Sequence, residues 1–137
     1  MSWDVLIMNY HGKPPKFEEI VGDPEPLGPA EEVRQAISAA LPGVDWTNPT
    51  WGLYGGDGFT FEFNSGAEDP ISTIMVHVRG SGNAVESLYK LAVPTNWSLL
   101  DCSTSEFLDL QNPSRSAWKD FQAYRDKIIE SYRDEVR

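Results

Sequence analysis

Hydrophobic and polar residues alternate along several short stretches of the chain, the pattern of β-strands that bury one face. The clearest case is FTFEFN, in which Phe59, Phe61 and Phe63 point one way and the polar residues between them point the other way. ISTIMVHVR follows a turn-forming SGAEDP segment and is expected to pair with the Phe strand as a hairpin. Further strands are expected at residues 3–10, 51–54, 96–102 and 106–110.

Three segments show the 3.6-residue spacing of amphipathic helices instead. In PAEEVRQAISAALPG (29–43), proline suits the first helical turn and Pro-Gly ends the pattern. NAVESLYKLA (83–92) is expected to be a second helix, with Asn83 and Glu86 at the spacing of a capping box. A long helix is expected to open at Asn112-Pro113 and to continue to the C-terminus.

The resulting order is β-α-β-β-β-α-β-β-α, in which single helices interrupt a cluster of strands. This order predicts an α+β fold with one mainly antiparallel sheet, three helices on it and a long helix at the end. The connectivity favours an elaborated ferredoxin-like, split βαβ plan. At 137 residues, the chain 1–137 is expected to form a single domain.

The charge of −10 is unevenly distributed. Residues 1–110 carry 16 acids and 5 bases, a balance of −11, whereas residues 111–137 carry 5 acids and 6 bases, a balance of +1. Such acidity argues against nucleic-acid and anionic-membrane partners, which require basic surfaces. Such acidity usually serves solubility alone, and the alternative is that it steers a basic protein partner towards the body of the molecule.

Several kinds of chemistry are excluded by composition. The single cysteine, Cys102, cannot form an intrachain disulfide, and His11 and His77 have no partner at metal-ligand spacing, so neither a metal nor a cofactor is expected. The apolar runs are shorter than a membrane helix requires. The N-terminus lacks the basic region of a signal peptide, so a cytoplasmic location is expected.

The segment RGSGN (79–83) has the glycines of a phosphate-binding loop before a helix. However, the G-x-G-x-x-G pattern fails because position 85 is Val, and no Gly-Lys-Ser/Thr follows for a Walker A loop. We therefore expect a tight turn between a strand and a helix.

The candidate binding site is a polar sheet face. Alternation places His77 and Arg79 on the side of their strand opposite the valines. Trp97 and Asp101 share one side of the strand NWSLLD. If both sides belong to the same face, these four residues gather around one groove, with Asp101 pairing to Arg79 and His77 available as a general base. The alternative is a structural ion pair and a half-exposed histidine.

A second candidate surface is a possible protein interface formed by aromatic residues in a Pro- and Gly-rich segment. Trp46, Trp51 and Tyr54 lie there near the acidic Asp57. Aromatic side chains are enriched at the centres of protein interfaces, but they also cover sheet edges. Both interpretations remain open at this stage.

The run VHVRGSGNAVESLYKLAVPTNWSLLDCSTSEFLDL resembles small uncharacterised bacterial α+β proteins, some of them similar to immunity proteins of toxin systems. The resemblance covers roughly residues 71–110 and implies a non-enzymatic protein that neutralises a basic partner. Two other hypotheses stand beside it. One is a small enzyme or small-molecule binder that uses His77, Arg79 and Asp101, and the other is a structural homo-oligomeric module.

Overall fold

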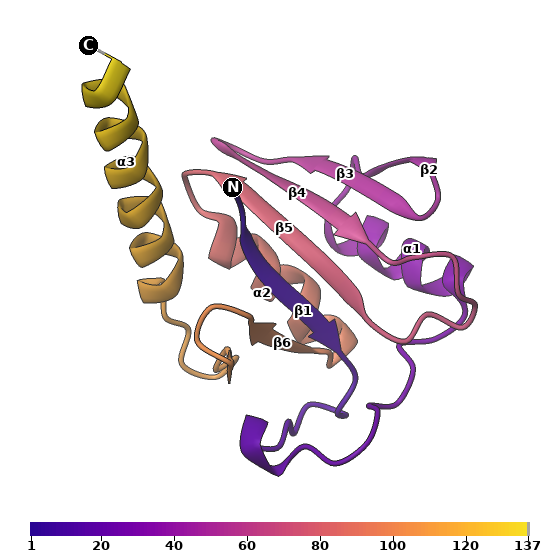
Figure 1. The fold of residues 1–137 in the computed structure, drawn as a ribbon. Coiled ribbons are helices and arrows are strands. Elements are labelled where there is room, and N and C mark those ends of the chain that lie inside the picture. Colours follow the sequence, from indigo (N-terminus) through magenta and orange to yellow (C-terminus); the bar gives the residue numbers. More distant parts are fainter. Residues whose placement is uncertain (137) are drawn as a thin grey trace.

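A computed structural model describes residues 1–136, and this part of the chain contains one seven-stranded sheet and three α-helices (Figure 1). The strands are β1 (Trp3–Met8), β2 (Asp45–Asn48), β3 (Trp51–Gly55), β4 (Phe59–Asn64), β5 (Ile74–Gly80), β6 (Ser98–Asp101) and β7 (Glu106–Phe107). The helices are α1 (Ala30–Ala40), α2 (Ala84–Thr95) and α3 (Ser116–Val136), with a short 3-10 turn η1 (Phe17–Glu19). The strand order is β2-β3-β4-β5-β1-β6-β7, and every neighbouring pair is antiparallel. The α+β prediction with a long final helix is therefore confirmed.

The predicted hairpin of β4 and β5 is also confirmed, whereas β2 was not predicted from the sequence. β2 is an edge strand of sequence DWTN, in which only Trp46 is partly buried, so the apolar pattern that marks a strand is missing. The capping box was wrong, because Asn83 makes no side-chain cap hydrogen bond and Glu86 pairs with Arg115 instead.

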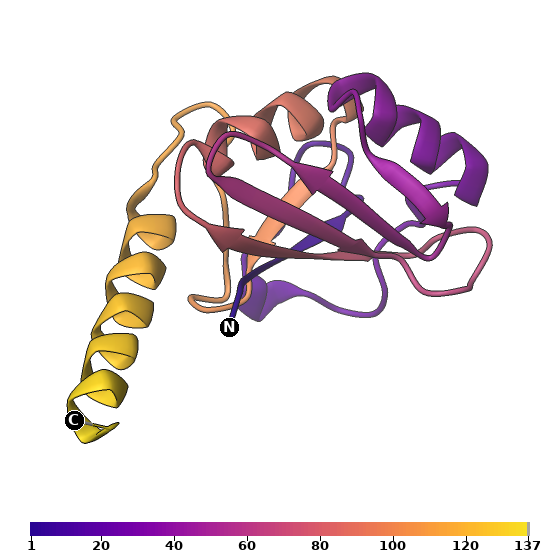
Figure 2. The same ribbon diagram turned by 90° about the horizontal axis from the view of Figure 1, so that it is seen from above.

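One face of the sheet forms the core. Its side chains come from alternate positions of the strands, and α1 and α2 lie together over it (Figure 2). Among the buried residues of this face are Trp3, Val5, Ile7, Phe61, Phe63, Ile74, Val76, Val78 and Leu99. We call this side of the sheet the covered face.

The other side of the sheet is only partly buried over β3, β4, β5 and the first half of β1. Cross-strand pairs such as Asp4 with His77, Glu62 with His77, and Leu53 with Glu62 place their side chains on this side. We call it the open face and define it by Asp4, Leu6, Trp51, Leu53, Thr60, Glu62, Asn64, Met75, His77 and Arg79, all of them partly buried or exposed.

The RGSGN segment is a tight turn from β5 into α2, and α3 packs against it. Gly80 and Gly82 have φ angles of +93° and +83°, which glycine adopts without strain. Trp118 of α3 donates a hydrogen bond from Nε1 to the Gly82 carbonyl oxygen at 3.0 Å, and Arg125 Nη1 donates to that of Gly80 at 2.5 Å. The turn therefore anchors the final helix.

Replacing Gly82 with alanine is expected to lower the free energy of unfolding by about 2 kcal/mol, measured by urea denaturation. A Cβ atom at this position would lie 2.3 Å from the Asp57 carbonyl oxygen, in addition to the strain of the positive φ angle. Gly55→Ala is the matched control, because a Cβ there would meet no atom within 4 Å. Equal stability of the two variants would contradict this view of the turn.

Within residues 1–136, the helices lack the combination of length and apolar character that spanning a bilayer requires.

Candidate functional site

The open face holds an oriented histidine. His77 Nδ1 lies 2.8 Å from Asp4 Oδ1, and Ser2 Oγ donates to the same carboxylate oxygen at 2.5 Å. The Trp51 ring stacks on the imidazole, with the ring centroids 5.8 Å apart. The Asp4 carboxylate and the Trp51 ring together fix the orientation of the imidazole.

The neighbouring ion pair neutralises the other charges of the open face. Arg79 Nη1 donates to Glu62 Oε1 at 2.5 Å across the β4–β5 pair. Both side chains are partly exposed, so this pair contributes little to stability.

Chemically, the open face offers one imidazole, that of His77. Its Nε2 makes no hydrogen bond among the described residues, and no hydroxyl or thiol is hydrogen-bonded to that atom there. On the other side of the ring, Ser2 Oγ lies 3.5 Å from Nδ1, and Nε2 remains available to accept a hydrogen bond.

The predicted grouping of His77, Arg79, Trp97 and Asp101 is wrong. Val5 pairs with both Val76 and Asp101, so Asp101 lies on the covered face, while His77 lies on the open face. Trp97 is also buried in the core. The structure therefore keeps His77 and Arg79 together, gives them Asp4 and Glu62 as partners, and separates them from the other two residues.

Asp101 is instead buried, and it accepts hydrogen bonds that stabilise the end of β6. Its residue surface is 1% exposed, and its Oδ1 accepts hydrogen bonds from Trp3 Nε1 at 3.0 Å and from the backbone N–H and Oγ of Ser103 at 2.9 and 2.6 Å. Oδ2 is buried and has no hydrogen-bond partner among the described residues. This carboxylate therefore ties the first strand to the turn that follows β6.

The candidate interface residues do not form one patch. Trp46 lies towards the core, packs near Phe63 and donates a hydrogen bond to Ser38 of α1 at 2.9 Å. Tyr54 pairs with Phe61 and faces the covered side, while Asp57 is exposed in the turn before β4. Of the four residues, only Trp51 lies on the open face, where it packs on the histidine.

Cys102 lies beside this face but is poorly suited to act as a nucleophile. Burial of the thiol raises its pKa above the ordinary value, and the carboxylates of Asp4 and Asp101 raise it further. A thiol with a raised pKa is less often ionised at neutral pH, and the thiolate is the reactive form.

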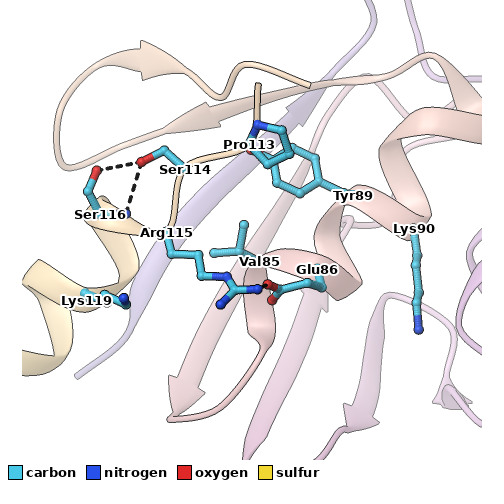
Figure 3. Close-up of a pocket in the computed structure, with 9 residues that line it drawn as sticks. All are labelled: Val85, Glu86, Tyr89, Lys90, Pro113, Ser114, Arg115, Ser116 and Lys119. Carbon is cyan, nitrogen blue, oxygen red and sulfur yellow. Dashed lines mark hydrogen bonds and ion pairs between the residues drawn. The ribbon is translucent and has the colours of Figure 1, made fainter. Parts of the chain in front are cut away.

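A cleft of about 940 Å³ lies where the chain passes from the body into α3 (Figure 3). It has basic side chains in an acidic protein, with Lys90, Arg115 and Lys119 among its lining residues. Figure 3 shows Arg115 reaching across to the Glu86 carboxylate, with which it forms an ion pair. Burial raises the pKa of Tyr89, which also lines the cleft. One basic side chain of the cleft, Arg115, is therefore already paired with Glu86. The cleft lies away from His77.

A smaller hollow of about 260 Å³ lies over β3 and β4. Leu53 and Glu62 of the open face line it. Leu53 is 46% exposed, which makes it the most exposed large hydrophobic side chain in the sheet. This hollow therefore leaves one apolar side chain of the open face in contact with solvent.

Sequence reasoning missed Asp4 and Glu62, the two carboxylates of the open face. Glu62 occupies a polar position in the alternating segment FTFEFN, so its outward direction was readable from the sequence, whereas Asp4 precedes a continuous apolar run that gives no direction. Their partners were not readable, because the register of β1 against β5 joins residues 73 positions apart.

Among the described residues, no cluster of three or more His, Cys, Asp or Glu side chains is arranged to hold a metal ion. Comparisons with protein-family models, with curated proteins and with solved structures find no match to the chain.

Proposed function

We propose that this protein is a non-enzymatic binding module that takes up a basic protein on the open face of its sheet. The observation that carries the proposal is the asymmetry of the sheet. Two helices cover one face, while the other face leaves Leu53 and parts of Trp51 and Met75 in contact with solvent. Aromatic side chains and methionine are enriched at the centres of protein interfaces, as Trp51 and Met75 would be in this proposal.

In this proposal, the negative charge of the body favours a basic partner. Residues 1–110 form the sheet and the two covering helices and have a balance of −11. On the open face itself, Arg79 is paired with Glu62, so its charge is already neutralised. The field of the acidic body then attracts a basic protein, and the exposed apolar side chains hold it after contact.

The resemblance of residues 71–110 to small bacterial proteins, some of them similar to toxin-system immunity proteins, supports a neutralising role in the bacterial cytoplasm. This segment comprises β5, α2, β6 and β7, which build the centre and one edge of the sheet. An immunity-like protein needs a rigid scaffold and a charged surface, and it needs no catalytic residues.

We also propose that the sheet elaborates a ferredoxin-like plan. The order β4-β5-β1-β6 supports this proposal, because β5 and β6 flank β1 and are connected by α2. Such an arrangement corresponds to a split βαβ unit, with the β2–β3 hairpin added at one edge.

The proposal is tested by expressing the tagged chain together with basic proteins encoded by neighbouring genes and measuring complexes at increasing salt. We expect a specific complex whose association rate constant falls by about tenfold or more between low and high salt, because steering by the acidic body is screened. A tight complex with a rate constant independent of salt would remove the electrostatic part of the proposal. The absence of binding to every basic candidate would contradict the proposal itself.

A further inference from the structure

The cleft between α2 and the start of α3 lies outside the surface that the proposed function uses. One wall is formed by residues on one side of α2, and the other wall is formed by residues 113–116 and Lys119 (Figure 3). Its volume of about 940 Å³ is at the upper end of the range of about 300–1,000 Å³ that is typical of sites for small molecules. The cleft is therefore large enough to hold a complete small organic molecule.

Part of the cleft wall is apolar. Val85 is 1% exposed, and it lines the cleft together with Tyr89 and Pro113. The Tyr89 hydroxyl donates a hydrogen bond to the Asp109 carbonyl oxygen at 3.3 Å, which fixes the position of the ring. These side chains offer contact to an aromatic or aliphatic group of a ligand, and burial of such a group is favourable in water.

The charged residues of the cleft are mostly basic, in contrast to the rest of the protein. Its lining contains the bases Lys90, Arg115 and Lys119 and one acid, Glu86, a balance of +2 in a protein whose net charge is −10. Among the described side chains, neither lysine forms an ion pair. Because charges of one sign that line a cleft concentrate ligands of the opposite sign, this lining favours an anion.

The basic side chain of Arg115 is held at the cleft by an ion pair. Its Nη2 pairs with Glu86 Oε1, and Figure 3 shows the guanidinium reaching towards this carboxylate. The ion pair engages one of the two terminal nitrogens, so other N–H donors of the guanidinium are available to a second anion. Ser114 Oγ and Ser116 Oγ lie 2.9 Å apart, so one hydroxyl proton joins them and the other is available to a ligand.

We propose that this cleft binds a small phosphate monoester whose organic group is apolar or aromatic. A phosphate monoester has a charge of about −1.5 to −2 at neutral pH and three terminal oxygens that accept hydrogen bonds. Its charge complements the balance of +2, and its oxygens complement the donors of Arg115, the two lysines and the serine pair. A carboxylate supplies about half of this charge, and a neutral ligand supplies none. The organic group then lies against Val85, Tyr89 and Pro113.

Titration of the full chain with phenyl phosphate, followed through the NMR signals of the backbone amides, tests the proposal. We expect saturable shifts confined to the cleft, such as those of Tyr89 and Ser116, with a Kd of about 1 mM or below. Inorganic phosphate has the charge without the ring, and benzyl alcohol has the ring without the charge. Each is therefore expected to bind at least about tenfold more weakly. The cleft shares no residue with the open face, and no basic protein takes part in this titration, so this proposal and the proposed function can fail separately.

Two variants with the same loss of charge locate the site. Lys119→Gln removes an ammonium group from the lining and is expected to weaken the binding of phenyl phosphate by about fivefold or more. Lys127→Gln removes one from the same helix outside the cleft and is expected to leave the Kd within about twofold of the wild type. Both lysines are exposed, so the fold is retained, as circular dichroism would verify.

Three results would each overturn the proposal. The first is the absence of saturable shifts at the cleft. The second is an affinity for inorganic phosphate or benzyl alcohol equal to that for phenyl phosphate, and the third is an equal effect of the two lysine variants.

Discussion

Replacing Asp101 with alanine is expected to lower the free energy of unfolding by about 3 kcal/mol, measured by urea denaturation. The substitution removes the acceptor of three hydrogen bonds and leaves the indole N–H of Trp3 buried without a partner. A buried donor without a partner is more costly than the average value of a hydrogen bond indicates. The sequence predicted that Asp101 lies in a binding groove. In the structure, Asp101 instead supports the first strand, β1.

Asp101→Asn is the matched control. Asparagine keeps the shape of the side chain and its Oδ1 acceptor, so the hydrogen bonds to Trp3 and Ser103 survive. Its NH2 group would replace the buried Oδ2, which has no hydrogen-bond partner among the described residues, so a loss of about 1–2 kcal/mol, smaller than that of alanine, is expected. Equal losses for alanine and asparagine would show that the hydrogen bonds through Oδ1 are not what stabilises the end of β6.

Replacing Trp118 with alanine is expected to be still more damaging, with a loss of about 3–5 kcal/mol. Its indole is 2% exposed, stacks on Trp3 and Phe121 with ring centroids 5.7 and 5.8 Å away, and donates a hydrogen bond to Gly82. Without this anchor, α3 has few contacts with the body, and an isolated helix of this length is only marginally stable. We therefore expect a loss of helical circular dichroism before the sheet unfolds.

Tyr124→Ala removes an aromatic side chain from the same helix at an exposed position. It should change the free energy of unfolding by no more than about 0.5 kcal/mol, measured at low protein concentration so that self-association does not contribute. If Tyr124→Ala and Trp118→Ala were equally destabilising, the described anchoring of α3 would be contradicted.

The alternation of residue types predicted most of the sheet, because a strand with one buried face must repeat every two residues. Phe59, Phe61 and Phe63 are buried as expected. The edge strand β2 escaped prediction because its burial depends on a single tryptophan. Edge strands make few contacts with the core, so their sequences show little of the strand period.

The site was harder to predict than the fold, because it depends on pairing between distant segments. Alternation showed that Trp97 and Asp101 share a side, but it did not say which face that side belongs to. The apolar Trp97 and Leu99 were the available signal, since two such neighbours indicate the covered face. The position of β1 between β5 and β6 then decides that Asp4, and not Asp101, meets His77.

The central proposal is that the open face is the binding surface. It is tested most directly by measuring the dissociation constant of the complex with a basic partner for two arginine variants. Leu53→Arg alters the open face, and Val93→Arg alters α2 in the covering layer at a similarly exposed aliphatic residue. We expect Leu53→Arg to weaken binding by about thirtyfold or more, a loss typical of a central interface position, and Val93→Arg to leave it within about threefold of the wild type. Wild-type affinity for Leu53→Arg, or an equal loss for Val93→Arg, would contradict the account.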